Sequence, residues 1–135
     1  MAMFRPVTDT LSVSPQITIA DVAAAAARGV TLIINNRPDG EDAGQTPAAD
    51  IEAAARAEGL DFVSVPIVGR PTPEQVAAIR ATIQGARGNV LAYCRSGTRS
   101  ITAWAMGEAL AGADRADIVS RGAAAGYDLS WLGPT

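Results

Sequence analysis

The sequence predicts an α/β sandwich in which helices flank a mostly parallel central sheet. Short apolar runs rich in β-branched residues alternate along the chain with alanine-rich stretches of helical character. Most of the apolar runs end in a polar loop, as strands of a buried sheet do. The length of 135 residues and the 48% of apolar residues suit one globular domain. We therefore expect residues 1–135 to form a single domain.

In the first part of the chain, each element has a local signature. Alternation of apolar and polar residues predicts a short strand over 11–14. Thr18 is a helix-capping residue ahead of an alanine-rich stretch that reaches Arg28 and ends at Gly29. The apolar run 30–34 predicts a buried strand that leads into a polar loop.

The alternation continues in the rest of the chain. An alanine-rich helical stretch over 48–58 precedes a strand over 61–65. Thr72 as a cap, Pro73 at the first helical position and an early acid predict a helix that reaches Gln84. The last strand and the elements after it are predicted as a buried strand over 89–93, helices over 100–110 and 114–125, and a short tail over 126–132.

The composition excludes several classes of function. The net charge of −3 is scattered, so we expect no nucleic-acid or membrane surface. The start of the chain lacks a signal peptide and no window approaches the roughly 18 apolar residues of a membrane span, so we expect a cytoplasmic protein. Histidine is absent, which removes the commonest general base and metal ligand. We expect no metal and no cofactor.

The segment 94–100, Cys-Arg-Ser-Gly-Thr-Arg-Ser, is the candidate site. It follows a buried strand, and ligands of open α/β sheets bind beyond the carboxyl ends of the strands. A helix that begins near Arg99 would direct its free N–H groups and positive dipole end into the loop. Gly97 would let the backbone turn so that N–H groups face inward. We expect these fields to hold Cys94 as a reactive thiolate.

Cys94 and Arg99 are the predicted catalytic residues. Arg99 can form paired, charge-assisted hydrogen bonds to an oxyanion, which lysine cannot copy. The alternative for Cys94 is a buried small hydrophobic residue, which its polar neighbours disfavour. Ser100 would donate to the sulfur or cap the helix, and Arg95 would bind substrate or face water. The predicted substrate-binding residues are Arg95, Ser96, Gly97, Thr98, Ser100, Arg37 and Asp39.

These motifs resemble those of the DUF442 family, whose domains occur alone or joined to persulfide dioxygenase-like (beta-lactamase-hydrolase-like) domains. The resemblance spans nearly the entire chain. It is carried by segments 11–16, 33–41, 65–67, 93–100 and 125–129. It implies the three-layer fold of tyrosine and dual-specificity phosphatases. For several members it also implies rhodanese-type sulfur transfer.

Three departures from the phosphatase pattern favour sulfur transfer. Phosphatases of this fold separate cysteine and arginine by five residues, whereas four lie between Cys94 and Arg99. The segment 65–70, where that fold carries its general acid, holds no carboxylate; sulfur transfer needs none, because sulfite or thiolate leaves without a proton. Tyr93 occupies the position of the histidine that usually precedes the cysteine.

We therefore predict a sulfurtransferase that uses small anionic or thiol substrates. Cys94 would take sulfane sulfur from thiosulfate or glutathione persulfide and pass it to cyanide or a thiol. A persulfide dioxygenase-type protein is the predicted partner. The alternatives are a phosphatase in which Asp39 or Glu41 supplies the acid, and a non-catalytic thiol sensor.

The segment 37–41 is expected at the same edge of the sheet as the cysteine loop. Arg37 would orient that loop or bind substrate. Asp39 and Glu41 have the alternative of being turn residues and solvated charges. Arg70 would attract an anion or be solvated. Gln16 is placed outside the site.

Overall fold

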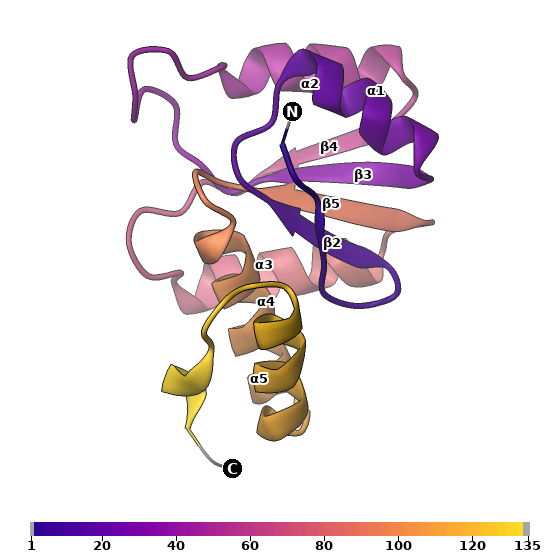
Figure 1. Ribbon diagram of the computed structural model, residues 1–135. Coiled ribbons are helices and arrows are strands. Elements are labelled where there is room, and N and C mark those ends of the chain that lie inside the picture. The colour runs from indigo at the N-terminus through magenta and orange to yellow at the C-terminus, as the bar shows by residue number, and fades with distance from the viewer. Residues whose placement is uncertain (1, 134–135) are drawn as a thin grey trace.

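A computed structural model describes residues 2–133 as one five-stranded sheet between two layers of helices (Figure 1). Residues 1, 134 and 135 of the predicted domain lie outside the described part. The strands are β1 (Arg5–Pro6), β2 (Leu11–Ser14), β3 (Val30–Asn35), β4 (Asp61–Ser64) and β5 (Asn89–Tyr93). They lie in the order β1-β2-β5-β3-β4, and all neighbours except β1 and β2 are parallel. The predicted mostly parallel α/β sandwich is confirmed.

Two helices cover one face of the sheet and three cover the other (Figure 1). The first pair is α1 (Ile19–Ala27) and α2 (Ala48–Ala57); the second group is α3 (Pro73–Gln84), α4 (Thr98–Leu110) and α5 (Arg115–Ala124). A short 3-10 helix, η1 (Ser130–Leu132), follows α5. Within residues 2–133, every helix is too short or too polar to cross a lipid bilayer.

Local signatures place the predicted elements within two residues of their observed ends. Thr18 and Thr72 form capping boxes with the third residues of α1 and α3, as their side chains suggest. Strand β1 was not predicted, because its two residues are too few to show periodicity. It exists through pairing alone, with Arg5 opposite Val13 and Pro6 opposite Ser12.

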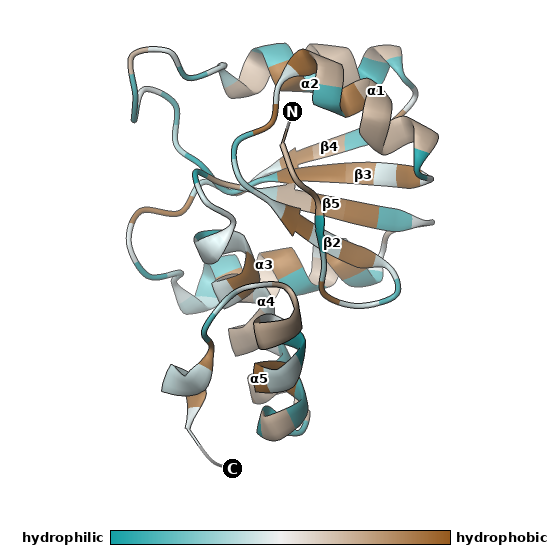
Figure 2. Ribbon diagram, viewed as in Figure 1, coloured by the Kyte–Doolittle hydropathy of each residue, from teal (hydrophilic) through white to brown (hydrophobic). Residues whose placement is uncertain are grey.

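Alternate residues of the central strands fill two separate cores. Ile33 and Leu91 pack against α1 and α2, whereas Ile34 and Ala92 pack against α4 and α5. This alternation is the two-residue period of a strand. Figure 2 shows brown, hydrophobic colour concentrated along the central strands. The sheet is therefore buried on both faces, which leaves its edges and strand ends for function.

The parallel strands bring four loops to one edge of the sheet. The N–H of Cys94, after β5, donates to the carbonyl of Ser14 in β2 at 3.3 Å. The N–H of Asn36, after β3, donates to the Tyr93 carbonyl at 2.8 Å, and the N–H of Ile67, after β4, donates to the Asn36 carbonyl at 3.0 Å. The backbone around Cys94 is thus bonded to the ends of β2 and β3, and the loop after β4 is joined to it through Asn36.

We predict that Ile33→Ala lowers the free energy of unfolding by about 2–5 kcal/mol, because it leaves a cavity in a close-packed core. Ile33 is fully buried on a central strand, whereas Ile19 is 56% exposed at the start of α1. Ile19→Ala is the matched control and should cost less than about 1 kcal/mol. Urea unfolding measures both. Equal losses in the two variants would contradict the packing described.

Candidate active site

Cys94 lies at the junction between the central strand β5 and the N-terminus of α4. The N–H of Gly97 donates to its Sγ at 3.1 Å. Gly97 caps the helix with φ of 92°, a left-handed conformation that glycine adopts without strain. The free N–H groups and the dipole of a 13-residue helix therefore begin beside the sulfur. This arrangement stabilises an anion at Sγ.

The Cys94 side chain has no exposed surface in this conformation. Cys94 is therefore buried, as the alternative of a small hydrophobic residue predicts. Its surroundings, however, differ from those of a structural cysteine, since it accepts a hydrogen bond at a helix N-terminus. A substrate reaches the sulfur only when side chains of the neighbouring loops move.

Arg99 extends from the first turn of α4 toward two other loops. Its Nη1 donates to Glu41 Oε2 at 2.8 Å and to the carbonyl of Ile67 at 2.8 Å, and its Nη2 donates to Glu41 Oε1 at 2.7 Å. The hydrogen bond to Glu41 is the main cause that raises the pKa of Arg99, and the charge and hydrogen bonding of Cys94 also raise it. Arg99 is therefore bound to the Glu41 carboxylate, and Cys94 is close enough to affect the pKa of its guanidinium.

Glu41 is held between two arginines. Besides Arg99, the Nε of Arg37 donates to its Oε1 at 2.8 Å. These bonds, with Arg99 first, lower the pKa of Glu41 to about 2. Glu41 is thus ionised at neutral pH and has no proton to give. The phosphatase alternative loses one of its two candidate acids.

Arg37 is a buried connector between loops. Its guanidinium also donates to Asp42 Oδ2 at 2.8 Å and to Gln16 Oε1 at 3.1 Å, and its side chain is 3% exposed. All three guanidinium nitrogens of Arg37 donate to side chains of the protein. This supports a role in orienting the loop rather than in binding substrate. Gln16, predicted outside the site, is part of this network. Arg95 is 64% exposed and lies 3.5 Å from Asp42, so it mostly faces water.

Asp39 binds the N-terminus of α2. Its Oδ1 accepts from the N–H of Ala48, the first residue of α2, at 2.9 Å. The N-cap residue of α2 is Pro47, whose side chain cannot accept that bond. Asp39 therefore accepts a hydrogen bond from a free N–H group at the start of α2. This structural role agrees with the alternative that Asp39 is a turn residue. It does not supply an acid to Cys94 in this arrangement.

The remaining hydroxyl residues of the loop differ in their roles. Ser96 and Thr98 bond to each other through their hydroxyls at 2.9 Å. Ser100 is buried and its Oγ has no partner among the described residues, so neither predicted bond, to sulfur or as a cap, is present. Asn36 Oδ1 is also buried and unpaired there. Within residues 2–133 no cluster of acidic, cysteine or histidine residues could hold a metal.

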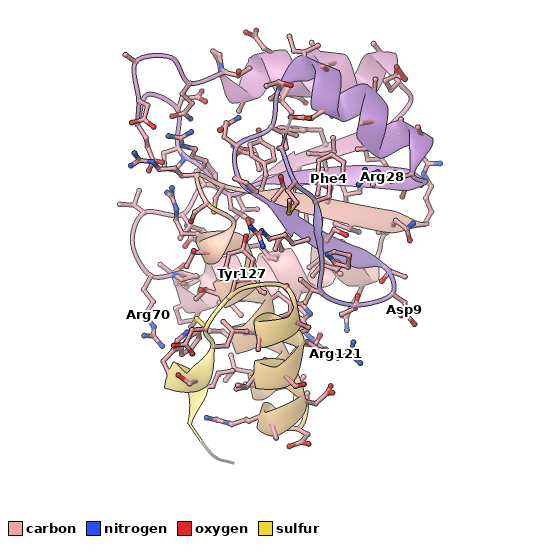
Figure 3. The ribbon with its side chains drawn as sticks, in the orientation of Figure 1. Phe4, Asp9, Arg28, Arg70, Arg121 and Tyr127 are labelled. Carbon is pink, nitrogen blue, oxygen red and sulfur yellow. The ribbon has the colours of Figure 1, made fainter. Side chains whose placement is uncertain are left out.

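Tyr127 is a contact that the sequence analysis missed. Figure 3 labels it on the segment after α5, and its hydroxyl donates to the carbonyl of Ser96 at 2.7 Å. A tail that lacks helix or strand periodicity gives no indication of its path. The only available signal was that segment 125–129 is one of those that carry the family resemblance.

Comparisons with known sequences agree on one family. Residues 3–111 match the family described as "Beta-lactamase hydrolase-like protein, phosphatase-like domain". Beta-lactamase hydrolase-like proteins of Agrobacterium fabrum and Xylella fastidiosa are each 38% identical to the chain, over 91% and 93% of its length. The matches cover 29% and 31% of those proteins. The chain thus spans less than a third of the length of these curated relatives.

Solved structures share the fold. A "putative phosphatase" from Neisseria meningitidis superposes with a TM-score of 0.85 at 34% identity, over 95% of this chain and 92% of that one. A DUF442 protein from Shewanella putrefaciens gives 0.70 at 20% identity, over 87% and 76%. Kinase associated phosphatase gives 0.71 at 12% identity, over 90% and 80%. The phosphatase-like fold and the DUF442 resemblance are confirmed.

We predict that Glu41 contributes acid-sensitive stability. Its pKa is lowered from 4.5 to about 2, so its contribution is complete above pH 4.5 and is lost as the pH falls toward 2. Glu41→Gln should lower the free energy of unfolding at pH 7 by about 2 kcal/mol, because charged hydrogen bonds are lost. The difference from wild type should narrow toward pH 2.

Glu52→Gln is the matched control, since Glu52 pairs with Arg56 on the exposed face of α2. It should follow the wild type within about 0.5 kcal/mol at every pH. Urea unfolding between pH 2 and pH 7 measures all three proteins. A constant difference between Glu41→Gln and wild type across that range would disprove the role of the ionised carboxylate.

Proposed function

Because the chain belongs to the family of beta-lactamase hydrolase-like protein, phosphatase-like domains, we propose that it is a cysteine-dependent enzyme that transfers sulfane sulfur through Cys94. Family and fold support a phosphatase-like enzyme with a cysteine nucleophile. The choice of sulfur as the transferred group comes from the site itself.

The ionised state of Glu41 carries this choice. Cleavage of a phosphoester benefits from an acid that protonates the leaving oxygen, worth about 10²–10⁴ in rate. Glu41 is engaged by two arginines, and Asp39 caps α2. The loop after β4, residues 65–71, contains no carboxylate. A site so arranged suits a leaving group that departs as an anion.

Sulfur transfer fits these groups step by step. The Cys94 thiolate attacks the outer sulfur of thiosulfate, a new S–S bond forms, and the original S–S bond breaks with its electron pair leaving on sulfite. The Gly97 N–H and Arg99 stabilise the anionic persulfide on Cys94. Cyanide or a thiol then removes the sulfur, which regenerates the thiolate. No step requires a carboxylic acid.

A phosphatase is the second candidate, and the comparisons favour it more directly than sulfur transfer. The Neisseria and Shewanella proteins carry phosphatase names, and the family description is phosphatase-like. In this reading Cys94 attacks phosphorus and forms a phosphocysteine. Arg99 would then bind the phosphoryl oxygens. Aryl phosphates would be the accessible substrates, since their leaving groups depend least on an acid.

Three parallel assays separate the candidates. The protein is given thiosulfate with cyanide, glutathione persulfide with a thiol acceptor, and an aryl phosphate, each beside Cys94→Ser. We expect thiocyanate or transferred sulfane sulfur with wild type only, and little phosphate release. Rapid hydrolysis of the aryl phosphate without sulfur transfer would replace this proposal with the second candidate. Reaction of Cys94 without turnover of any substrate would identify a thiol sensor.

We also predict that Arg99→Lys lowers kcat/KM for the sulfur donor by about tenfold to a hundredfold. Lysine keeps the positive charge but cannot make the paired bonds to Glu41 and still reach Cys94. One charged hydrogen bond accounts for a loss of this size. Arg56→Lys, on the exposed pair with Glu52, is the control and should leave kcat/KM unchanged. Equal kcat/KM in both variants would remove Arg99 from the catalytic residues.

The chain spans less than a third of the length of its curated relatives, so its physiological partner stays a prediction. A persulfide dioxygenase-type partner remains a prediction from the family resemblance. Copurification of the full-length protein with sulfur-oxidising activity would test that prediction.

A further inference from the structure

One peptide unit of the cysteine loop takes part in two hydrogen bonds at opposite ends. The Ser96 carbonyl and the Gly97 N–H belong to the same peptide. The N–H donates to Cys94 Sγ at 3.1 Å, and the carbonyl accepts from the Tyr127 hydroxyl at 2.7 Å. No peptide among the described residues is cis, so the two groups point in opposite directions. The bond from Tyr127 therefore determines where the N–H points.

Tyr127 is itself held in place from the other end of the chain. Nη1 of Arg5, on β1, donates to the carbonyl of Ala125 at 3.1 Å. The Arg5 guanidinium carbon lies 5.6 Å from the centre of the Tyr127 ring, within the range of a cation–π contact. Arg5 and the segment after α5 thus hold the tyrosine in place where it contacts the loop.

The contact between Tyr127 and the loop is close enough to restrict it. A Cβ added at Gly97 would collide with the Tyr127 hydroxyl. Burial raises the pKa of Tyr127, so its hydroxyl is neutral and can donate at neutral pH. Glycine accepts many backbone conformations, so the peptide before Gly97 is restrained less by its own sequence than other peptides are. Tyr127 adds a restraint from outside the loop.

We propose that Tyr127 is a positioning residue for the nucleophile, whose hydroxyl holds the Ser96–Gly97 peptide so that the Gly97 N–H stabilises the Cys94 thiolate. The proposal rests on Cys94 being the nucleophile, and it holds whether sulfur or phosphorus is transferred. Tyr127 touches neither substrate nor sulfur in this role. It acts on Cys94 only through the orientation of the Ser96–Gly97 peptide.

Tyr127→Phe tests the proposal, because it keeps the ring and the Arg5 contact and removes only the hydroxyl. The readout is the rate at which iodoacetamide alkylates Cys94 between pH 4 and pH 10, which gives the midpoint pH of thiolate formation. Thiolate is the reacting form, and at pH 10 nearly every cysteine is ionised. We expect the midpoint to rise by about half to one pH unit, the range of one neutral hydrogen bond, and the rate at pH 10 to stay the same.

The pH 10 measurement separates positioning from folding. Cys94 affects the pKa values of Arg99 and Tyr127, and arginine stays charged throughout this range. A variant that merely loosens the loop would change the rate at pH 10 as well. That outcome, or equal midpoints for variant and wild type, overturns the proposal.

Ser130→Ala is the control, since it removes a hydroxyl from the same segment whose contact is to Asp128 and not to the loop. Its alkylation rates should equal those of wild type. A second measurement is the ¹H–¹⁵N NMR spectrum, in which the Gly97 amide signal of Tyr127→Phe should move more than those of α4. An unmoved Gly97 signal overturns the proposal even if the alkylation rates change. Because alkylation needs no sulfur donor, failure of the sulfur-transfer assays leaves this test intact.

Discussion

The carboxylate of Glu41, held between Arg37 and Arg99, joins the loop after β3 to the loop that carries Cys94. Its two oxygens accept three hydrogen bonds from the two guanidinium groups, at 2.7 to 2.8 Å. This bonding orients Arg99 and keeps Glu41 ionised. The same interaction therefore fixes a cation in the cysteine loop and withdraws a candidate acid from it. The sulfur transfer that we propose and the acid-sensitive stability that we predict both rest on that single carboxylate.

The fold could be predicted from the sequence because its signals are local. Capping residues at Thr18 and Thr72, glycines after helices and β-branched runs each define an element without reference to the rest of the chain. Parallel strands then require their following loops to meet at one edge. That rule predicts from the sequence alone that segment 37–41 and Cys94 lie at the same edge.

The partners within the site could not be predicted, because they depend on side-chain packing between distant segments. Glu41 and Arg99 lie 58 residues apart, and the sequence around each residue does not indicate the other as its partner. The sequence places Gln16 outside the site, yet Gln16 binds Arg37; it makes Asp39 a candidate, yet Asp39 caps α2. Tyr127 reaches the loop from a tail without periodicity. Such contacts depend on the tertiary structure, which local sequence patterns do not determine.

The mass of the protein after brief exposure to a donor tests the central claim most directly. With thiosulfate, the peptide that contains Cys94 should gain about 32 Da, the mass of one sulfur atom, and cyanide should remove it. Cys94→Ser should gain nothing. A gain of about 80 Da from an aryl phosphate, with no gain from thiosulfate, would mark a phosphocysteine and contradict sulfur transfer.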